Sequence, residues 1–201
     1  MTIVDCTYEN AAAARGFTSI CGVDEAGRGP LAGPVYAAAV ILPPEFEIPG
    51  LNDSKKLSEK KRDQLFDVIR AQAVAYAVAS VDERVIDEIN ILQATFLAMR
   101  KAVEALPVPA DYAIIDGNRM PPLAIPGETL IKGDALSPSV AAASILAKVS
   151  RDRFLLELDA RYPEYQFAKH KGYGTKLHYE MLAQYGPSPC HRRTFLKNLY
   201  R

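Results

Sequence analysis

The sequence GVDEAGRGPLAGPV, residues 22–35, contains two adjacent carboxylates, Asp24 and Glu25. Carboxylates placed side by side repel each other, and every glycine in the following turn costs backbone entropy when the chain folds. Three glycines lie in that turn: Gly27, Gly29 and Gly33. Proteins accept such costs mainly where they build a site, so this stretch is the first candidate for chemistry.

Two more acids occupy a similar place in the pattern. The apolar run YAIID predicts a buried strand that ends on Asp116, and TLIKGD predicts another that ends near Asp134. In open α/β sheets, ligands gather at the carboxyl ends of the strands. We therefore expect these two acids to share one crevice with the first pair.

The first pair raises a geometric difficulty. Successive side chains of a regular strand point to opposite faces, so Asp24 and Glu25 would diverge. We expect the strand to break at this point, since Gly27 and Gly29 permit an irregular backbone.

Clustered carboxylates must either take up protons or bind cations. Oxygen ligands without a neighbouring histidine suit Mg²⁺ or Mn²⁺ better than Zn²⁺. Two such ions, about 3.5–4 Å apart, would activate a water molecule and stabilise the leaving oxygen in phosphoryl transfer. The alternative is that some of these acids cap loops or form salt bridges, because aspartate is common where strands end.

Other catalytic motifs fit less well. The start of the glycine-rich stretch resembles a P-loop, but Arg28 and Gly29 stand where lysine and serine or threonine are needed. The glycine spacing does not match GxGxxG, and the sequence contains neither GxSxG nor HExxH.

The elements that must position these residues alternate between strand and helix patterns. Apolar runs predict strands over residues 19–24, 35–42, 73–80, 112–116 and 129–134, the first two forming a hairpin. Helices are predicted over residues 82–106 and after the N-cap residues Ser58, Ser137 and Thr175. This order indicates an α/β fold with a mixed sheet, and 201 residues suit one domain.

Composition narrows the class of protein. Hydrophobic residues make up 49 % and charged residues 24 %, as in an ordinary soluble domain, with no long apolar run or signal-like start. The three cysteines, Cys6, Cys21 and Cys190, fit neither a disulfide framework nor a CxxC metal site. These features predict a cytoplasmic protein without a membrane segment.

Charge is unevenly distributed although the formal net charge is zero. Residues 166–201 hold seven of the 24 Lys/Arg but one of the 24 Asp/Glu. We expect this basic segment to contact phosphates through Lys169, Lys171, Arg192 and Arg193, the alternative being a solvated helical tail. His170, His178 and His191 lie in the same segment without metal-ligand spacing, so we expect them at the surface or against anions.

Taken together and in order, the motifs identify a family resemblance. The sequences GVDEAGRGPLAGPV, LNDSKKLSEKKR, IIDGN, KGD with AAASILAKVSRDR, and HKGYGT with HRRTF resemble ribonuclease HII over nearly the whole chain. The resemblance implies an RNase H-like fold: a mixed β-sheet flanked by helices, plus a C-terminal helical extension. It also implies metal-dependent endonucleolytic cleavage of RNA in RNA–DNA hybrids, with 5′-phosphate and 3′-hydroxyl ends.

The resemblance also assigns roles to residues. Asp24, Glu25, Asp116 and Asp134 match the acidic positions of the family, which hold Mg²⁺ or Mn²⁺ and carry catalysis. Gly27, Arg28 and Gly29 match the loop that contacts the ribonucleotide backbone. Tyr173 matches the tyrosine that senses the junction between ribose and deoxyribose. A family member with these residues cuts on the 5′ side of single ribonucleotides in duplex DNA, the first step of ribonucleotide excision repair.

Further expectations concern organisation and partners. We predict a catalytic domain over residues 1–165 and a basic helical segment over residues 166–201 that packs against it and contacts substrate. The expected partners are RNA–DNA hybrid and ribonucleotide-containing DNA, with no membrane, no obligatory protein partner and a monomeric chain. The alternatives are another RNase H-like metal nuclease, such as ribonuclease HIII or a junction resolvase, and a catalytically silent hybrid-binding module.

Overall fold

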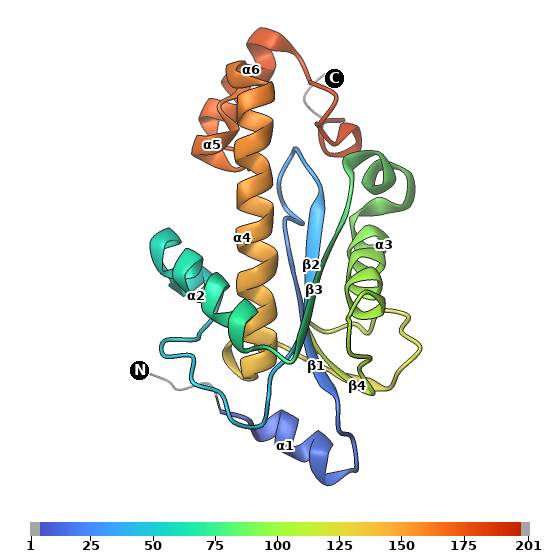
Figure 1. Ribbon diagram of the computed structural model, residues 1–201. Helices are drawn as coiled ribbons and strands as arrows, with labels where there is room; N and C mark the ends of the chain where they lie inside the picture. The colour runs from blue at the N-terminus through green and yellow to red at the C-terminus, as the bar shows by residue number, and fades with distance from the viewer. Residues whose placement is uncertain (1–4, 198–201) are drawn as a thin grey trace.

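A five-stranded mixed sheet forms the centre of the molecule, as a computed structural model of residues 5–197 describes it (Figure 1). Its strands are β1 (Ile20–Ala26), β2 (Val35–Ile41), β3 (Ala75–Val81), β4 (Tyr112–Asp116) and β5 (Gly127–Leu130). The α-helices are α1 (Thr7–Ala14), α2 (Glu59–Gln72), α3 (Glu83–Glu104), α4 (Pro138–Arg161), α5 (Phe167–His170) and α6 (Lys176–Tyr185). Short 3-10 turns are η1 (Ser54–Lys56), η2 (Gly133–Ala135), η3 (Pro163–Tyr165) and η4 (Arg193–Phe195).

The strand order is β3-β2-β1-β4-β5. β1 pairs antiparallel with β2, and β2 antiparallel with β3, which confirms the predicted hairpin. β4 pairs parallel with β1 and with β5, so the carboxyl ends of β1 and β4 lie at the same edge. The predicted α/β class with a mixed sheet is confirmed.

Helices cover both faces of the sheet. α3 packs on one face, where Val23 and Ala39 lie in a core with Met99, and α2 and α4 pack on the other (Figure 1). Small side chains let α4 approach closely, and Gly22 of β1 lies directly under its first turn. A Cβ atom added at Gly22 would lie 2.1 Å from the Ser139 carbonyl carbon.

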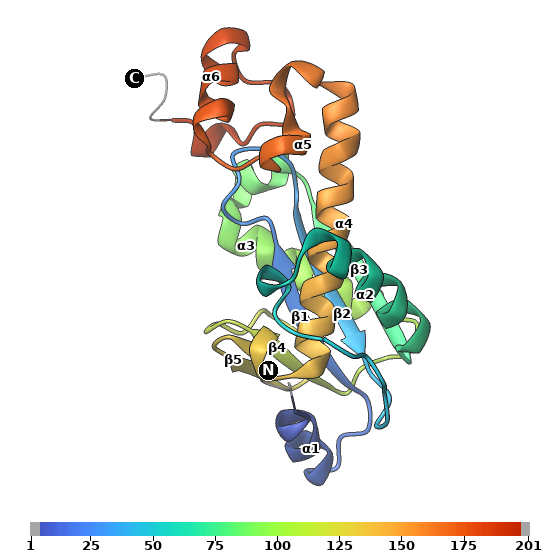
Figure 2. The same ribbon diagram turned by 90° about the vertical axis from the view of Figure 1, so that its left-hand side faces the viewer.

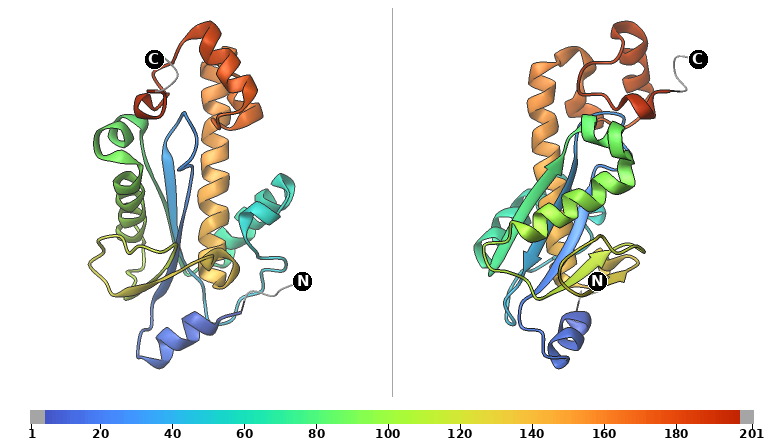
Figure 3. Two further views of the ribbon diagram at one scale, coloured as in Figure 1. Left: turned by 180° about the vertical axis from the view of Figure 1, so that it is seen from behind. Right: turned by 90° about the vertical axis from the view of Figure 1, so that its right-hand side faces the viewer.

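The C-terminal segment packs against one side of the far end of α4, beyond the sheet (Figures 2 and 3). There α5, α6 and the residues around Cys190 enclose a separate apolar core with Leu31 and Leu155. A β-bridge joins Ala32 of the β1–β2 loop to His191. The division of the chain near residue 165 stays a prediction.

Local signals placed most elements correctly. The side chains of Ser58, Ser137 and Thr175 cap α2, α4 and α6, as predicted. The predicted strand TLIKGD is wrong in its second half: β5 ends at Leu130, and Lys132 adopts a left-handed conformation with φ +63°. α1 was not predicted. None of the described helices is long and apolar enough to cross a membrane.

The contact between β1 and α4 gives the first prediction. Replacing Gly22 with Ala places a methyl group inside the α4 backbone, so we expect the free energy of unfolding to fall by about 3 kcal/mol or more. Gly29→Ala is the control, because its Cβ would lie 3.8 Å from the nearest atom. Urea unfolding measures both. Equal midpoints for the two variants would mean that α4 does not need this close approach.

Candidate active site

Asp24 and Glu25 lie inside β1, which runs without a break to Ala26. The expected break in the strand is therefore wrong, and the two side chains do point to opposite faces of the sheet. Asp24 faces α4, where Ser144 donates a hydrogen bond to its carboxylate, and is 3 % exposed. Glu25 faces the side of α3 and lines a hollow of about 360 Å³ together with Arg28 and Asp116.

Asp116 connects the two acids. β4 pairs with β1 as far as Val23 opposite Ile115, so Asp116 is the next residue beyond the ladder, beside Asp24. Burial raises the pKa of Asp24 well above its ordinary value, and the carboxylates of Glu25 and Asp116 raise it further. Burial and Asp116 also raise the pKa of Glu25, while Arg28 opposes that rise. Asp116, at the end of β4, therefore acts on both acids although their side chains point to opposite faces of the sheet.

Asp134 reaches the cluster from η2 rather than from a strand end. Burial and the nearby Asp116 raise its pKa to about 6. The main-chain N–H of Gly133 donates a 2.7 Å hydrogen bond to Asp116 Oδ1, which fixes η2 against the end of β4. All four predicted acids therefore lie near one edge of the sheet, where Asp116 acts on the other three.

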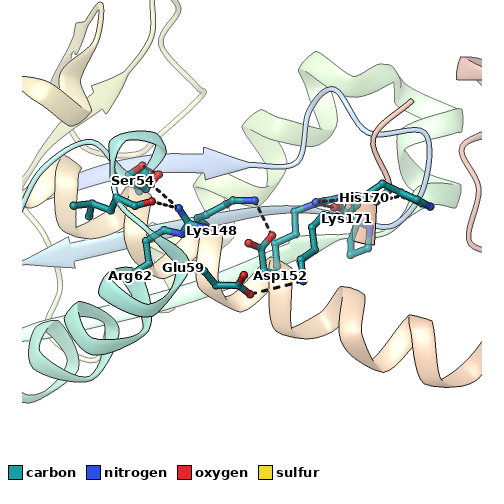
Figure 4. Close-up of polar contacts among 12 residues, drawn as sticks. Ser54, Glu59, Arg62, Lys148, Asp152, His170 and Lys171 are labelled. Atoms are coloured by element: carbon teal, nitrogen blue, oxygen red, sulfur yellow. Dashed lines mark hydrogen bonds and ion pairs between the residues drawn. The ribbon is translucent and has the colours of Figure 1, made fainter. Parts of the chain in front are cut away.

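Lys55 of η1 supplies positive charge to this cluster, a role the sequence did not suggest. Its Nζ lies 3.6 Å from Asp134 Oδ2. Burial opposes its charge, but Asp134, Asp24, Asp53 and Asp116 together raise its pKa. Arg62 Nη1 holds η1 in place through the carbonyls of Ser54 and Leu57, at 3.0 and 2.6 Å (Figure 4).

These donors fit a hard divalent cation in chemistry. All of them are carboxylate oxygens, and the raised pKa values of Asp24, Glu25 and Asp134 indicate that the negative charge is incompletely balanced. Within residues 5–197, however, no group of three His, Cys, Asp or Glu side chains is gathered tightly enough to hold an ion. Asp116 is turned to Gly133 and Asp134 to Lys55, so the acids would have to turn inward to do so.

The loop after β1 is held from inside by a buried arginine. Arg192 is 0 % exposed and donates three hydrogen bonds to main-chain carbonyls of this loop: Gly27 at 2.6 Å, Arg28 at 2.9 Å and Gly33 at 2.9 Å. Burial lowers its pKa to about 9, and the neighbouring Arg151 cation lowers it too. The guanidinium stays charged at neutral pH, so it offers the carbonyls charge-assisted bonds.

Arg151 of α4 is a second buried arginine with the same kind of partners. It is 0 % exposed and donates to the carbonyls of Pro34, Ala32 and Lys171, at 3.2, 3.1 and 3.0 Å. Gly27 is required beside it: its φ is +95°, and a Cβ atom there would lie 2.1 Å from Arg151 Nε. Arg151 follows Ala147 and precedes Leu155 on the buried stripe of α4, a signal that could have identified it.

The basic segment is partly reassigned. Arg192 was expected to contact phosphate, and this is wrong for the described structure, because its N–H groups are consumed inside the protein. Arg193 and Lys169 are exposed or partly exposed, so they stay candidates. Lys171 is half-buried, and its Nζ lies 3.9 Å from Glu59 Oε1 of α2 (Figure 4).

The three histidines also differ from expectation. His170, His178 and His191 are 7 %, 0 % and 2 % exposed, so they are neither surface residues nor anion ligands. All three rings contact Phe167 inside the C-terminal core, His170 and His178 edge-on and His191 at a tilt.

Tyr173 lies between the glycine-rich loop after β1 and the C-terminal core that holds the histidines. Its side chain is 43 % exposed, and its ring approaches the glycine-rich loop so closely that a Cβ at Gly29 would lie 3.8 Å from its Cε1 atom. The Arg151 guanidinium carbon is 5.9 Å from the ring centroid. An exposed aromatic ring, a glycine-rich loop and a carboxylate cluster thus adjoin one another.

Known proteins share this sequence and this arrangement. The ribonuclease HII family model matches residues 21–198. The chain belongs to the ribonuclease HII family. Ribonuclease HII of Caldicellulosiruptor saccharolyticus is 57 % identical over 186 residues, which cover 92 % of this chain and 91 % of that protein. Ribonuclease HII of Dechloromonas aromatica is 60 % identical over 176 residues, covering 88 % and 90 %.

Solved structures agree. Ribonuclease H2 of Pyrococcus horikoshii superposes with a TM-score of 0.72 at 30 % identity, over 88 % of this chain and 93 % of that one. Ribonuclease HII of Archaeoglobus fulgidus, solved in complex with PCNA, gives a TM-score of 0.71 at 26 % identity, over 87 % and 94 %. The present chain is thus a type 2 ribonuclease H, an endoribonuclease acting on RNA–DNA substrates. Its expected monomeric state stays a prediction.

The buried arginines give the second prediction. Arg192→Ala leaves three main-chain carbonyls without their donors, so we expect it to lower the free energy of unfolding by about 3 kcal/mol or more. Arg193→Ala, next in sequence and exposed, should change it by less than about 0.5 kcal/mol. Chemical denaturation of both variants tests this. If Arg192→Ala is as stable as the wild type, Arg192 does not hold the loop and is again a candidate for contacting phosphate.

Proposed function

We propose that this ribonuclease HII cuts on the 5′ side of single ribonucleotides in duplex DNA, and within longer hybrids, leaving 5′-phosphate and 3′-hydroxyl ends. The observation that carries the proposal is the approach of the Tyr173 ring to Gly29, in the loop that directly follows Asp24 and Glu25 of β1. It puts a group able to test a sugar next to groups able to support hydrolysis.

Asp24, Glu25, Asp116 and Asp134 are the proposed ligands of Mg²⁺ or Mn²⁺. Their oxygen-only donors support this choice over Zn²⁺. Ribonuclease HIII from Bst, which shares the fold, was solved in complex with Mn²⁺. Divalent ions at these carboxylates supply an activated water and stabilise the leaving oxygen in phosphodiester hydrolysis.

Lys55 supplies positive charge that a bound metal ion would replace. Its 3.6 Å ion pair with Asp134 partly balances the carboxylates. Since Lys55 is mostly exposed, with 78 % of its side-chain surface accessible, it can leave the cluster at little cost. We propose that the acids turn inward as Lys55 withdraws.

The loop of Gly27, Arg28 and Gly29 is the proposed contact for the substrate backbone. Arg192 draws the carbonyls of Gly27 and Arg28 inward. In a planar trans peptide the N–H points opposite to the carbonyl, so the N–H groups of Arg28 and Gly29 face away from Arg192. Successive outward N–H groups suit a phosphate or a ribose hydroxyl oxygen, and the exposed Arg28 side chain adds charge.

Tyr173 is the proposed sensor of the junction. RNA differs from DNA at one position by its 2′-hydroxyl, which both donates and accepts hydrogen bonds. A half-exposed tyrosine offers a flat ring to the sugar and a phenol to that hydroxyl. Lys169, Lys171 and Arg193 are proposed to contact phosphates farther along the duplex.

The metal site is tested by removing one buried charge. Asp24→Asn should abolish cleavage, yet raise the Tm of the metal-free protein by about 2–4 °C, because burial and two neighbouring carboxylates oppose the Asp24 charge. Added Mg²⁺ or Mn²⁺ should raise the Tm of the wild type and not of the variant. Differential scanning calorimetry with and without each ion measures this.

Asp63→Asn is the matched control, since it removes an exposed acid of α2 outside the cluster. It should keep both the activity and the ion-dependent shift in Tm. If Asp24→Asn still shows the full shift, Asp24 does not hold the metal.

Substrate recognition is tested with a duplex that contains one ribonucleotide. Tyr173→Ala should lower the cleavage rate about a hundredfold, because a misplaced sugar loses the reactive geometry. Its thermal shift with Mn²⁺ should stay as in the wild type. Tyr185→Ala, another exposed tyrosine at the end of α6, serves as control. A rate in Tyr173→Ala equal to that of Tyr185→Ala would remove Tyr173 from recognition.

A further inference from the structure

Three buried imidazoles lie together in the C-terminal core: His178 and His191 are hydrogen-bonded to each other, and His170 stacks on His178. The rings of His170 and His178 stack with centroids 4.2 Å apart, and those of His178 and His191 are 5.1 Å apart. The Nε2 atoms of His178 and His191 are 2.9 Å from each other. Such a contact between two buried imidazoles requires that only one of them carries a proton there.

The main chain fixes which one carries it. The Ser188 N–H lies 3.0 Å from His191 Nδ1 and the Ser188 hydroxyl 2.8 Å from it. The hydroxyl can donate or accept, but the main-chain N–H can only donate, so Nδ1 is the unprotonated acceptor. Neutral His191 then carries its proton on Nε2 and donates it to His178. His178 therefore carries its own proton on Nδ1, which lies 2.9 Å from the Tyr173 carbonyl. The chain has one direction: Ser188, His191, His178, Tyr173.

The chain ends on the main chain of the exposed tyrosine. The Tyr173 carbonyl accepts from both His178 and the Thr175 N–H at 2.8 Å, and its own N–H donates to the His170 carbonyl at 2.9 Å. Both peptide groups around Tyr173 are thus anchored while its ring faces Gly29.

We propose that His178 and His191 are positioning residues for Tyr173, and that their opposed neutral tautomers set where its ring stands against the substrate. This inference rests on the recognition role proposed above for Tyr173. The imidazoles do not touch the substrate. They act through the Tyr173 carbonyl.

The surroundings admit no additional proton. The titratable groups facing the pair are His170, stacked on His178, and Tyr165, whose ring is 4.9 Å from His191; Cys190 contacts Ser188, and Asp159 acts on His170. A proton added to His178 would set two N–H groups against each other at Nε2. One added to His191 would face the Ser188 N–H.

The electrostatics of the pair agree with this reading. Burial, together with the neighbouring imidazoles, lowers the pKa of His178 and of His191 to about 4. The pair is therefore neutral near pH 7. Because each folded pKa lies below the ordinary 6.5, stability should be full above pH 6.5 and be lost as the pH falls towards 4.

Paired variants of one residue test the positioning role. His178→Asn keeps an N–H near the position of Nδ1, whereas His178→Phe keeps the ring and loses the donor. On the single-ribonucleotide duplex, we expect His178→Phe to lower the rate about tenfold or more and His178→Asn to stay within about threefold of wild type. Thermal shifts with Mn²⁺ should be unchanged in both. Equal rates for the two variants would overturn the proposal.

A packing control accompanies them. Phe167→Leu removes contact with all three imidazoles but no polar atom of the chain, so its rate should match the wild type where it is folded. If it slows cleavage as much as His178→Phe, packing alone positions the loop and the proposal fails.

If Tyr173→Ala leaves the rate unchanged, the recognition role fails. If only Tyr173→Ala slows it, the histidine chain alone fails.

A spectroscopic measurement needs no variant. In ¹⁵N NMR of the intact chain at pH 7, His191 should show its proton on Nε2 and His178 on Nδ1. Identical tautomers, or a cationic ring in either residue, would contradict the proposed chain.

Discussion

Mutual repulsion among buried carboxylates is the constraint on which this structure depends. β1 and β4 end at the same edge, and the chain places Asp24 and Asp116 there, with the exposed Lys55 and Arg28 as nearby cations. Raised pKa values record the cost, which the close packing of α4 on β1 must offset. A site that is electrostatically strained without an ion gains stability by binding one. The same repulsion therefore links folding, metal affinity and catalysis.

The second device is the use of buried arginines to shape backbone. Arg151 and Arg192 donate six hydrogen bonds to carbonyls, joining the loop after β1 to the C-terminal segment. Desolvating two guanidinium groups is costly, but the carbonyls would otherwise be unsatisfied, so loop and cations stabilise each other. The arginines hold the loop so that its main chain forms the surface. Gly27 and Gly29 suit this loop because they have no side chains to cover that main chain. The proposed recognition of a sugar–phosphate backbone by this loop would thus depend on arginines buried beneath it.

Local signals in the sequence predicted the sheet and most helices, because apolar periodicity and N-cap residues act over a few positions. They also predicted that the four acids lie near one another, while their role as metal ligands stays a prediction. The strand break predicted at Asp24 and Glu25 was wrong, because Asp116 from a neighbouring strand gathers them without one. Arg192 could not be predicted, since its carbonyl partners lie 159 to 165 residues earlier in the chain. Its charge suggested a phosphate contact, and only the three-dimensional structure shows the buried alternative.

The central claim is that the carboxylates at the ends of β1 and β4 form the metal site. Anomalous X-ray diffraction from crystals of the intact chain grown with Mn²⁺ tests it most directly. We predict a manganese signal within coordinating distance of Asp24 and Asp116, with Lys55 displaced from Asp134. A manganese signal elsewhere, or none in protein that cleaves hybrid under the same conditions, would contradict the account.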